Sequence, residues 1–264
     1  MLTRITLAQV NSTPDPAENL AVIDTAATRA ADAGAQLVVF PEAMMRCFGE
    51  PLGEIAQPID GPWADAVRGI AERAGLTVVA GMFTPADAGR VYNTVLVTGG
   101  GVDAHYDKIH RYDAFGFAES DTVAPGEKPL RVEIAGTPVG FATCYDLRFP
   151  GLFQTMAADG ADLIVVPASW GDGPGKVEQW QLLTRARALD STAYVAACDQ
   201  ALPAIVPDAY ATAPLGVGHS CVAAPDGTLL DALGADSELL TVDIDPTRVA
   251  ELRKVLPVLA NRRY

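Results

Sequence analysis

One cysteine, Cys144, stands where a nucleophile is commonly found in an α/β protein. It follows the apolar run Val139–Thr143, and the segment Tyr145–Pro150 leads from it toward a predicted helix. A thiol at such a strand-to-helix turn lies at a sheet edge, where nearby backbone N–H groups favour the thiolate. From these residues alone a buried structural thiol is as good an interpretation as a nucleophile, so Cys144 needs partners.

Two residues offer complementary chemistry. Glu42 comes just after the wholly apolar strand Leu37–Phe40, which places its carboxylate at the carboxyl edge of a sheet, where α/β folds bind ligands. Partial burial there would raise its pKa and make it a usable base. Lys108 follows another predicted strand at the head of a long loop, and it would suit a developing oxyanion as a fixed positive charge. The ordinary alternative for each is a solvated surface charge.

The other cysteines, Cys47, Cys198 and Cys221, have weaker claims. Cys198 and Cys221 sit in apolar strands and read as core residues. The sequence contains no Cys-x-x-Cys, and its three histidines form no ligand pair at helical spacing, so we expect no zinc site and no metal. His110 and His219 are the available histidine partners for Cys144, but neither is flanked by a recognisable sequence motif.

Composition restricts the class of protein further. The chain has 264 residues, 49% of them hydrophobic, and a formal net charge of −14. It can bury a large core, and its acidity argues against a nucleic-acid binder. It has no apolar run of 18 residues and no basic-then-apolar leader before the first strand, so we expect no membrane span and a reduced, cytoplasmic compartment. With no linker or repeat in view, we expect one domain over residues 1–264.

Strands and helices alternate along the chain, which predicts a layered α/β fold. The predicted strands are Ile5–Val10, Gln36–Phe40, Leu76–Gly81, Tyr92–Thr98, Pro138–Thr143, Asp162–Val166, Ala193–Cys198, His219–Ala224 and Leu239–Ile244. The predicted helices are Ala17–Ala33, Pro62–Ala74, Pro150–Asp159, Lys176–Asp190 and Pro246–Val255.

The sheets are expected to be mixed, because wholly apolar strands occur beside a predicted hairpin. In that hairpin Val91–Val97 and Val102–Tyr106 flank a glycine-rich turn. Two long segments, Asp107–Lys128 and Ala201–Gly218, read as loops. Loops of this length in a compact domain are usually functional or mobile.

Taken together, the motifs around Glu42, Lys108 and Cys144 are more specific than any one of them. Their order and spacing closely resemble those of the nitrilase, or carbon–nitrogen hydrolase, superfamily, and the resemblance runs over nearly the whole chain. The segments that carry it are Phe40–Glu42, Tyr92–Thr94, Tyr106–His110, Glu119–Ser120, Thr143–Pro150, Pro167–Trp170, Arg185–Ala188, Gly218–Ser220 and Pro225–Gly227.

The resemblance implies an α-β-β-α sandwich with mixed sheets, which commonly pairs into a homodimer with a longer layered stack. It implies a catalytic triad in which Glu42 is the base, Lys108 stabilises the oxyanion and Cys144 is the nucleophile. Glu119 matches a second glutamate that many members carry beside the triad, and would orient Lys108 or the substrate. No metal or organic cofactor is required. The backbone N–H of Tyr145 would be a second oxyanion donor.

Within the family, residues 144–150 look most like the amidase branch that includes ω-amidase and deaminated-glutathione amidase. We therefore expect a thiol amidase that converts a small linear amide of a carboxylic acid to the acid and ammonia through a thioester. The alternatives are an N-carbamoyl amidohydrolase, disfavoured because that branch more often has tryptophan after the nucleophile, a nitrilase, and a catalytically silent binding protein. The chain ends at Tyr264, which leaves no room in this sequence for an appended synthetase domain.

An acidic substrate needs a local cation, because the negative net charge gives no long-range attraction. Among Arg46, Arg111 and Arg148, the sequence favours Arg111 because it sits in an open loop, whereas Arg148 is expected to pair with Asp146 or another acid. The predicted substrate-binding residues are Tyr145, Arg111, Trp170 and Phe117, although Trp170 and Phe117 could equally belong to the core. Arg185 and Arg187 are expected to serve the fold or a subunit interface.

Overall fold

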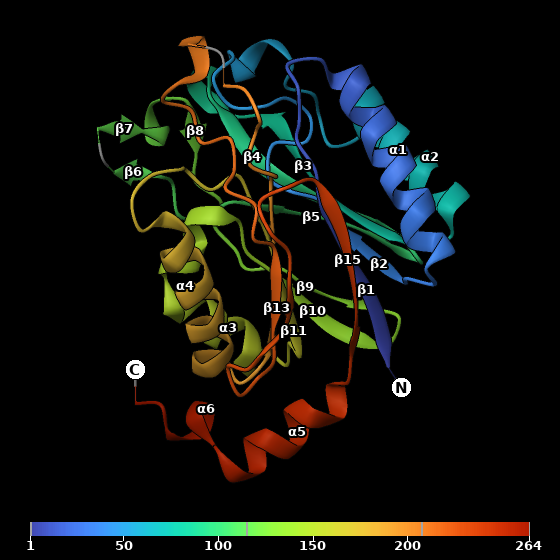
Figure 1. Ribbon diagram of the computed structural model, residues 1–264, viewed down its shortest axis with the longest axis vertical. Helices are drawn as coiled ribbons and strands as arrows, with labels where there is room; N and C mark the ends of the chain where they lie inside the picture. Colours follow the sequence, from blue (N-terminus) through green and yellow to red (C-terminus); the bar gives the residue numbers. More distant parts are fainter. Residues whose placement is uncertain (1, 115, 207, 264) are drawn as a thin grey trace.

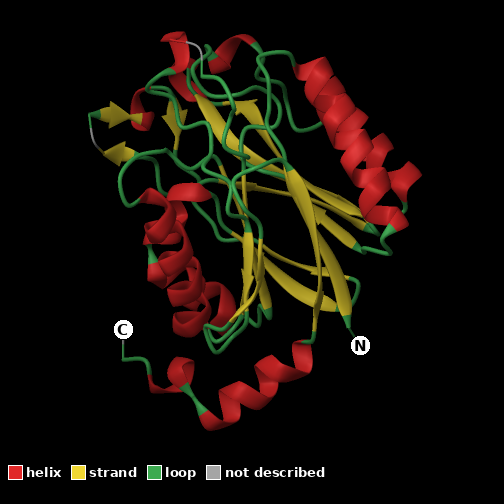
Figure 2. Cartoon of the chain, viewed as in Figure 1, coloured by secondary structure: helices red, strands yellow, loops and turns green. Residues whose placement is uncertain are grey.

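The computed structural model describes residues 2–114, 116–206 and 208–263. Two β-sheets lie face to face in the middle of the molecule, and a pair of helices covers the outer face of each (Figure 1). The layer order is therefore α-β-β-α, as the resemblance to the carbon–nitrogen hydrolase superfamily implies. Coloured by secondary structure, the loops gather at one end of the two sheets (Figure 2).

The first sheet has the strand order β15-β1-β2-β3-β4-β5, with β8 beside β4. Its strands are β1 (Thr3–Gln9), β2 (Leu37–Val39), β3 (Thr77–Pro85), β4 (Val91–Gly99), β5 (Val102–Asp107), β8 (Val123–Ala124) and β15 (Glu238–Ile244). β1, β2 and β3 run parallel. β15 runs antiparallel to β1, β4 runs antiparallel to β3 and β5, and β8 runs parallel to β4. The sheet is mixed, and the predicted hairpin is the β4–β5 pair.

The second sheet has the order β14-β13-β12-β11-β10-β9, with β10, β11 and β12 parallel. Its strands are β9 (Arg131–Ile134), β10 (Thr137–Phe141), β11 (Leu163–Ala168), β12 (Tyr194–Asp199), β13 (Cys221–Ala223) and β14 (Leu229–Ala232). A separate small hairpin joins β6 (Asp113–Ala114) to β7 (Phe117–Ala118). The antiparallel strands β9 and β14 are short and border the sheet, and neither was predicted.

All five predicted helices are present. They are α1 (Pro16–Asp32) and α2 (Pro62–Ala74) outside the first sheet, α3 (Pro150–Ala158) and α4 (Lys176–Ser191) outside the second, and α5 (Pro246–Val255), which α6 (Val258–Asn261) follows. Two of them begin with a side-chain cap: the Asp15 carboxylate accepts the N–H of Ala17 at the start of α1, and the Asp245 carboxylate accepts that of Thr247 at the start of α5.

Wholly apolar strands are explained by burial on both faces. In β2, Leu37 and Val39 pack between the two sheets, while Val38 packs under α1 and α2. In β11, Leu163 and Val165 pack between the sheets in the same way, while Ile164 packs toward α3 and α4. Burial on both faces removes the polar-apolar alternation of a half-exposed strand.

Three differences from the sequence-based assignment have local causes. β11 continues through Pro167, although proline has no N–H to donate to a neighbouring strand. Pro167 lies beyond Val165, the last residue paired with β10, so no hydrogen bond of the sheet is lost on that side. β13 begins after His219, because His219 has a φ of 57° and breaks the ladder. The segment 107–128 is not simply a loop, since it holds β6, β7, β8 and the 3₁₀ helix η3 (Glu119–Asp121).

Strand direction decides where chemistry can take place. The strands β2 and β5 in one sheet, and β10, β11 and β12 in the other, all end at the loop-rich end of the sandwich. Within the described residues, no helix is both long and apolar enough to cross a membrane.

Candidate active site

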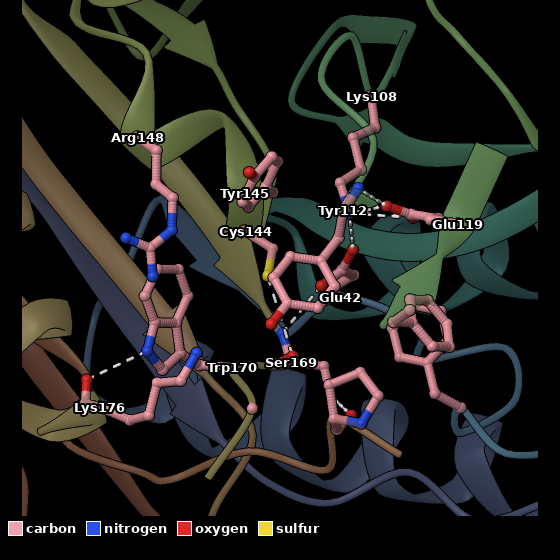
Figure 3. A pocket seen from close by; sticks show the side chains of 14 residues that line it. Glu42, Lys108, Tyr112, Glu119, Cys144, Tyr145, Arg148, Ser169, Trp170 and Lys176 are labelled. Carbon is pink, nitrogen blue, oxygen red and sulfur yellow. Dashed lines mark hydrogen bonds and ion pairs between the residues drawn. The ribbon is translucent and has the colours of Figure 1, made fainter. Parts of the chain in front are cut away.

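A cavity opens at this end of the sandwich and brings together residues from distant parts of the sequence (Figure 3). Glu42 follows β2, Lys108 follows β5, and Cys144 follows β10. All three line the cavity, and so does Glu119 from η3. The cavity is further lined by Phe48, Tyr112, Phe117, Tyr145, Arg148, Ser169, Trp170, Gly171, Lys176 and Pro214.

Cys144 sits at a sharp turn. Its φ of 44° lies in the left-handed region, and it begins the 3₁₀ helix η4 (Cys144–Arg148), which leads into α3. The residue is 9% exposed. Its sulfur lies 3.8 Å from the backbone carbonyl oxygen of Ser169, the residue that follows β11.

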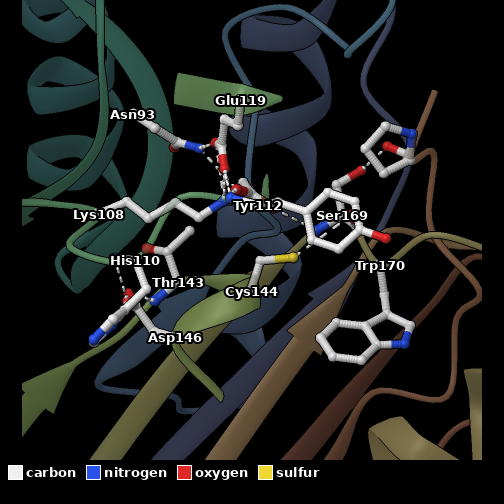
Figure 4. A network of polar contacts seen from close by, with 12 residues as sticks. Asn93, Lys108, His110, Tyr112, Glu119, Thr143, Cys144, Asp146, Ser169 and Trp170 are labelled. Carbon is white, nitrogen blue, oxygen red and sulfur yellow. Dashed lines mark hydrogen bonds and ion pairs between the residues drawn. The ribbon is translucent and has the colours of Figure 1, made fainter. Parts of the chain in front are cut away.

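The turn is held by Asp146, whose side chain is fully buried. Its carboxylate accepts hydrogen bonds from the backbone N–H of Thr143 at 2.8 Å and from the Tyr106 hydroxyl at 2.7 Å. It also accepts the backbone N–H of His110 and contacts His110 Nδ1 at 2.7 Å. Asp146 therefore connects the residues before Cys144 to the segment that follows Lys108 (Figure 4).

His110 is engaged by Asp146 on one side and stacks its ring on Phe149, with the ring centroids 3.7 Å apart. It supports the turn. The charge partners of Cys144 in this cavity are instead a glutamate and a lysine.

Lys108 lies between two carboxylates. Its Nζ is 3.0 Å from Glu42 Oε1, and 3.0 and 2.9 Å from the two carboxylate oxygens of Glu119. Asn93, near the start of β4, donates its side-chain amide to Glu42 Oε1 at 2.7 Å. The backbone N–H of Ser169 holds the other Glu42 oxygen at 2.9 Å. Every one of these side chains is buried.

Burial sets the proton affinities. Burial raises the pKa of the Glu42 carboxyl, and the charge of Lys108 only partly offsets it. For Lys108, burial acts in the opposite direction, but the carboxylates of Glu119 and Glu42 outweigh it and raise the pKa of the ammonium well above its usual range. The pKa of the Cys144 thiol is also raised well above its usual value, first by burial and then by the charge of Glu42.

These directions define the resting state of the site. The raised pKa values favour a charged Lys108 and a neutral Cys144 thiol, which would have to lose its proton to act as a nucleophile. Glu42, with its raised pKa and its position beside Lys108, is the group equipped to accept a proton. The arrangement therefore has the components of thiol-based attack on a carbonyl carbon beside a fixed positive charge.

Three of the four predicted substrate-binding residues, Phe117, Tyr145 and Trp170, line the cavity. Arg111 does not, because the chain turns back into the β6–β7 hairpin just after it. Arg148 lines the cavity in its place.

The expected ion pair between Arg148 and Asp146 does not form, since Asp146 is occupied by the donors described above. Arg148 instead donates to the side-chain carbonyl of Gln179 at 2.9 Å and lies over the Trp170 ring, 4.9 Å from its centroid. Arg46 donates hydrogen bonds to the backbone carbonyls of Pro14 and Pro51. Arg187 serves the fold, as expected, by donating to the Leu147 carbonyl at 2.7 Å.

Sequence reasoning overlooked several residues at the site. Lys176 lines the cavity, and a signal for it existed, since it is one of only four lysines in the chain. Asn93 and Ser169 lie in the motifs Tyr92–Thr94 and Pro167–Trp170, but their contacts with Glu42 depend on which strands meet at the sheet edge. Asp199, at the end of β12, carried no signal in the sequence.

The chain belongs to the carbon–nitrogen hydrolase family, whose model matches residues 4–254. Its amidase-type relatives include deaminated glutathione amidase of Escherichia coli O157:H7, 33% identical over 94% of this chain and 92% of that protein. The ω-amidase NIT2 of Xenopus tropicalis is 33% identical over 99% and 95%. In the solved structure of XC1258 from Xanthomonas campestris, a CN-hydrolase superfamily protein, the fold superposes with a TM-score of 0.86 at 25% identity, covering 100% and 98% of the two chains. The predicted nitrilase-like fold and family are thus confirmed.

Proposed function

We propose that this protein is a thiol amidase that hydrolyses the terminal amide of a small carboxylic acid to the acid and ammonia. The observation that supports this most directly is the meeting of Cys144, Glu42 and Lys108, from three distant segments, around one cavity. The relatives named as deaminated glutathione amidase and ω-amidase support the same class of reaction.

In the first half of the reaction, Cys144 Sγ attacks the amide carbon while Glu42 accepts the thiol proton. The carbonyl oxygen becomes an oxyanion, stabilised by the Lys108 ammonium and by the backbone N–H of Tyr145. Loss of one such donor typically raises the barrier by about 3–4 kcal/mol. The carbon–nitrogen bond then breaks, Glu42 returns the proton to the leaving nitrogen, and ammonia departs from a thioester.

In the second half, water attacks the thioester carbon and gives up a proton to Glu42. The carbon–sulfur bond breaks, the proton returns to Cys144, and the carboxylic acid leaves. Glu119 acts through Lys108: its carboxylate holds the ammonium by two contacts and is itself held by the backbone N–H of Tyr112. We assign Glu119 a positioning role.

The far part of the cavity supports a substrate that carries a negative charge. Arg148 and Lys176 both line it, close enough that the Arg148 charge helps to lower the pKa of Lys176, second only to burial. A bound anion offsets the repulsion between two cations in a partly buried site. A carboxylate at the end of a short linear amide fits this requirement, with Trp170 and Tyr145 alongside.

The reaction is tested by measuring ammonia release from a panel of half-amides of dicarboxylic acids. Wild type should release ammonia and acid in equal amounts, and Cys144→Ala should release none. Turnover that survives in Cys144→Ala would refute the mechanism. Carbon dioxide among the products would point instead to an N-carbamoyl substrate.

The substrate class is tested with Arg148→Gln and the matched control Arg111→Gln. Arg148→Gln should raise KM for a half-amide by about 10- to 100-fold, as expected for a lost charge-assisted contact. KM for a neutral amide of the same length should barely change, and Arg111→Gln should leave both values near wild type. An equal effect of the two substitutions would contradict the assignment. The proposal also includes the cytoplasmic location and the homodimer expected from the sequence.

A further inference from the structure

Asp199 is a buried carboxyl group beside the triad that the mechanism above does not use. It is the last residue of β12, paired with Ala168 of β11, and none of it is exposed. One carboxylate oxygen accepts the backbone N–H of Trp170 at 2.8 Å, and the other accepts the backbone N–H of Val217 at 2.8 Å. Both partners are backbone groups of segments that line or border the cavity.

The Trp170 N–H belongs to the peptide group that joins Ser169 to Trp170. The carbonyl of that same group lies 3.8 Å from Cys144 Sγ. A peptide group is planar and trans, so an acceptor that fixes its N–H also fixes the direction of its C=O. Figure 4 shows Cys144 with its sulfur directed toward Ser169.

The next peptide group back along the chain contacts the base. The backbone N–H of Ser169 donates to Glu42 Oε2 at 2.9 Å. A shift in the peptide that follows Ser169 would therefore change two contacts together: the one that Ser169 makes to the Cys144 sulfur and the one that it makes to Glu42.

The second oxygen of Asp199 contacts another segment that lines the cavity. Val217 lies at the end of the segment 201–218, in which Pro214 lines the cavity. The Pro214 carbonyl accepts the Ser169 hydroxyl at 2.6 Å, and the Trp170 carbonyl accepts the backbone N–H of Gly216 at 3.1 Å. The segment is therefore joined to Ser169 and Trp170 both directly and through Asp199.

We propose that Asp199 is a positioning residue that holds the Ser169–Trp170 peptide, and through it the mutual orientation of the Cys144 thiol and Glu42. This role rests on the proposed thiol chemistry. The titratable groups that face Asp199 are Glu42, Cys144 and, on its own strand, Cys198.

Asp199→Asn is the direct test, because it keeps the size of the side chain while its amide group can accept only one of the two N–H donors. We expect kcat for a half-amide to fall by about tenfold or more, as expected for a buried donor left unpaired, with KM changed less than about threefold. The rate of Cys144 alkylation by iodoacetamide should fall as well, with a changed dependence on pH.

Ser220→Ala is the matched control. The Ser220 hydroxyl accepts the backbone N–H of Asp199 at 2.9 Å, so its loss weakens the same strand end without touching the Ser169–Trp170 peptide. We expect Ser220→Ala to lower thermal stability while keeping kcat and the alkylation rate within about twofold of wild type.

The proposal is overturned if Asp199→Asn matches Ser220→Ala in kcat and alkylation, or if it changes KM alone. Alkylation requires no amide substrate, so it tests Asp199 even if no half-amide is hydrolysed and the proposed function fails. Should Asp199→Asn not fold, hydrogen exchange in the wild type decides. The Trp170 amide should exchange only on global unfolding, and rapid exchange would refute the role.

Discussion

Two buried acidic sites lie side by side in this molecule and are compensated in opposite ways. Glu42 and Glu119 share the ammonium of Lys108, whereas both oxygens of Asp199 are bound by backbone N–H groups. Burial raises the pKa of Asp199 to about 8. An ammonium keeps a buried acid ionised and able to exchange protons, while neutral backbone donors supply direction with little charge.

The comparison separates two tasks of the active site. The first sheet and its loops supply Glu42, Lys108 and Asn93, which form the charged cluster. The second sheet supplies Cys144 and the peptide that Asp199 holds. In the proposed mechanism, proton transfer depends on the first region and the direction of attack on the second. The following substitutions disturb one region at a time.

The largest effect is expected from Lys108→Met, which leaves two buried carboxylates without their cation. Activity should fall by about 10³-fold, because the oxyanion loses its charged donor. The free energy of unfolding should drop by about 3–5 kcal/mol, as is usual when one partner of a buried ion pair is removed. Ammonia release and denaturant unfolding measure the two losses. Lys128→Met, at an exposed lysine, should change neither.

Glu119→Gln should act more mildly, lowering kcat by about 10- to 100-fold through Lys108. The carboxylate of Glu119 is the strongest upward influence on the pKa of Lys108. Its neutralisation lowers that pKa, so the alkaline limb of the kcat profile should move to lower pH. An unchanged alkaline limb would mean that Glu119 does not act through the ammonium.

Asp199→Asn should also alter the pH dependence of stability. The pKa of Asp199 is about 8 in the folded protein and about 3.9 when unfolded, so between these values the folded state binds the extra proton. This stabilisation is lost as the pH rises toward 8. The melting temperature of wild type relative to Asp199→Asn should therefore fall between about pH 5 and pH 8 and level off above. If the melting temperature of wild type relative to Asp199→Asn rose with pH instead, the raised pKa of Asp199 would be contradicted.

The smallest effect is expected from Tyr106→Phe, which removes one donor to Asp146 below the Cys144 turn. Stability should fall by about 1–3 kcal/mol, the cost of a lost buried hydrogen bond, with a few-fold loss of kcat and no change in the pH profile. Tyr194→Phe is the control, because Tyr194 is equally buried but donates to the Asp245 carbonyl. It should lose stability without losing activity.

Local patterns of apolar strands and alternating helices predicted a layered α/β fold, and the resemblance to the family implied the order of its layers. The sequence also indicated Glu42, Lys108 and Cys144, whose flanking motifs are distinctive. It did not predict that Arg148 rather than Arg111 lines the cavity, since that depends on the β6–β7 hairpin turning the chain away. Asp199 could not be found either, because its importance comes from the pairing of β11 with β12, which no single segment encodes.

The backbone at Cys144 has one more consequence. A φ of 44° suits glycine, and other residues adopt it at a cost of about 1–3 kcal/mol. If the proposed mechanism holds, Cys144→Gly should abolish turnover while it relieves this backbone cost. The backbone conformation at this position therefore favours the one residue type that cannot perform the proposed reaction.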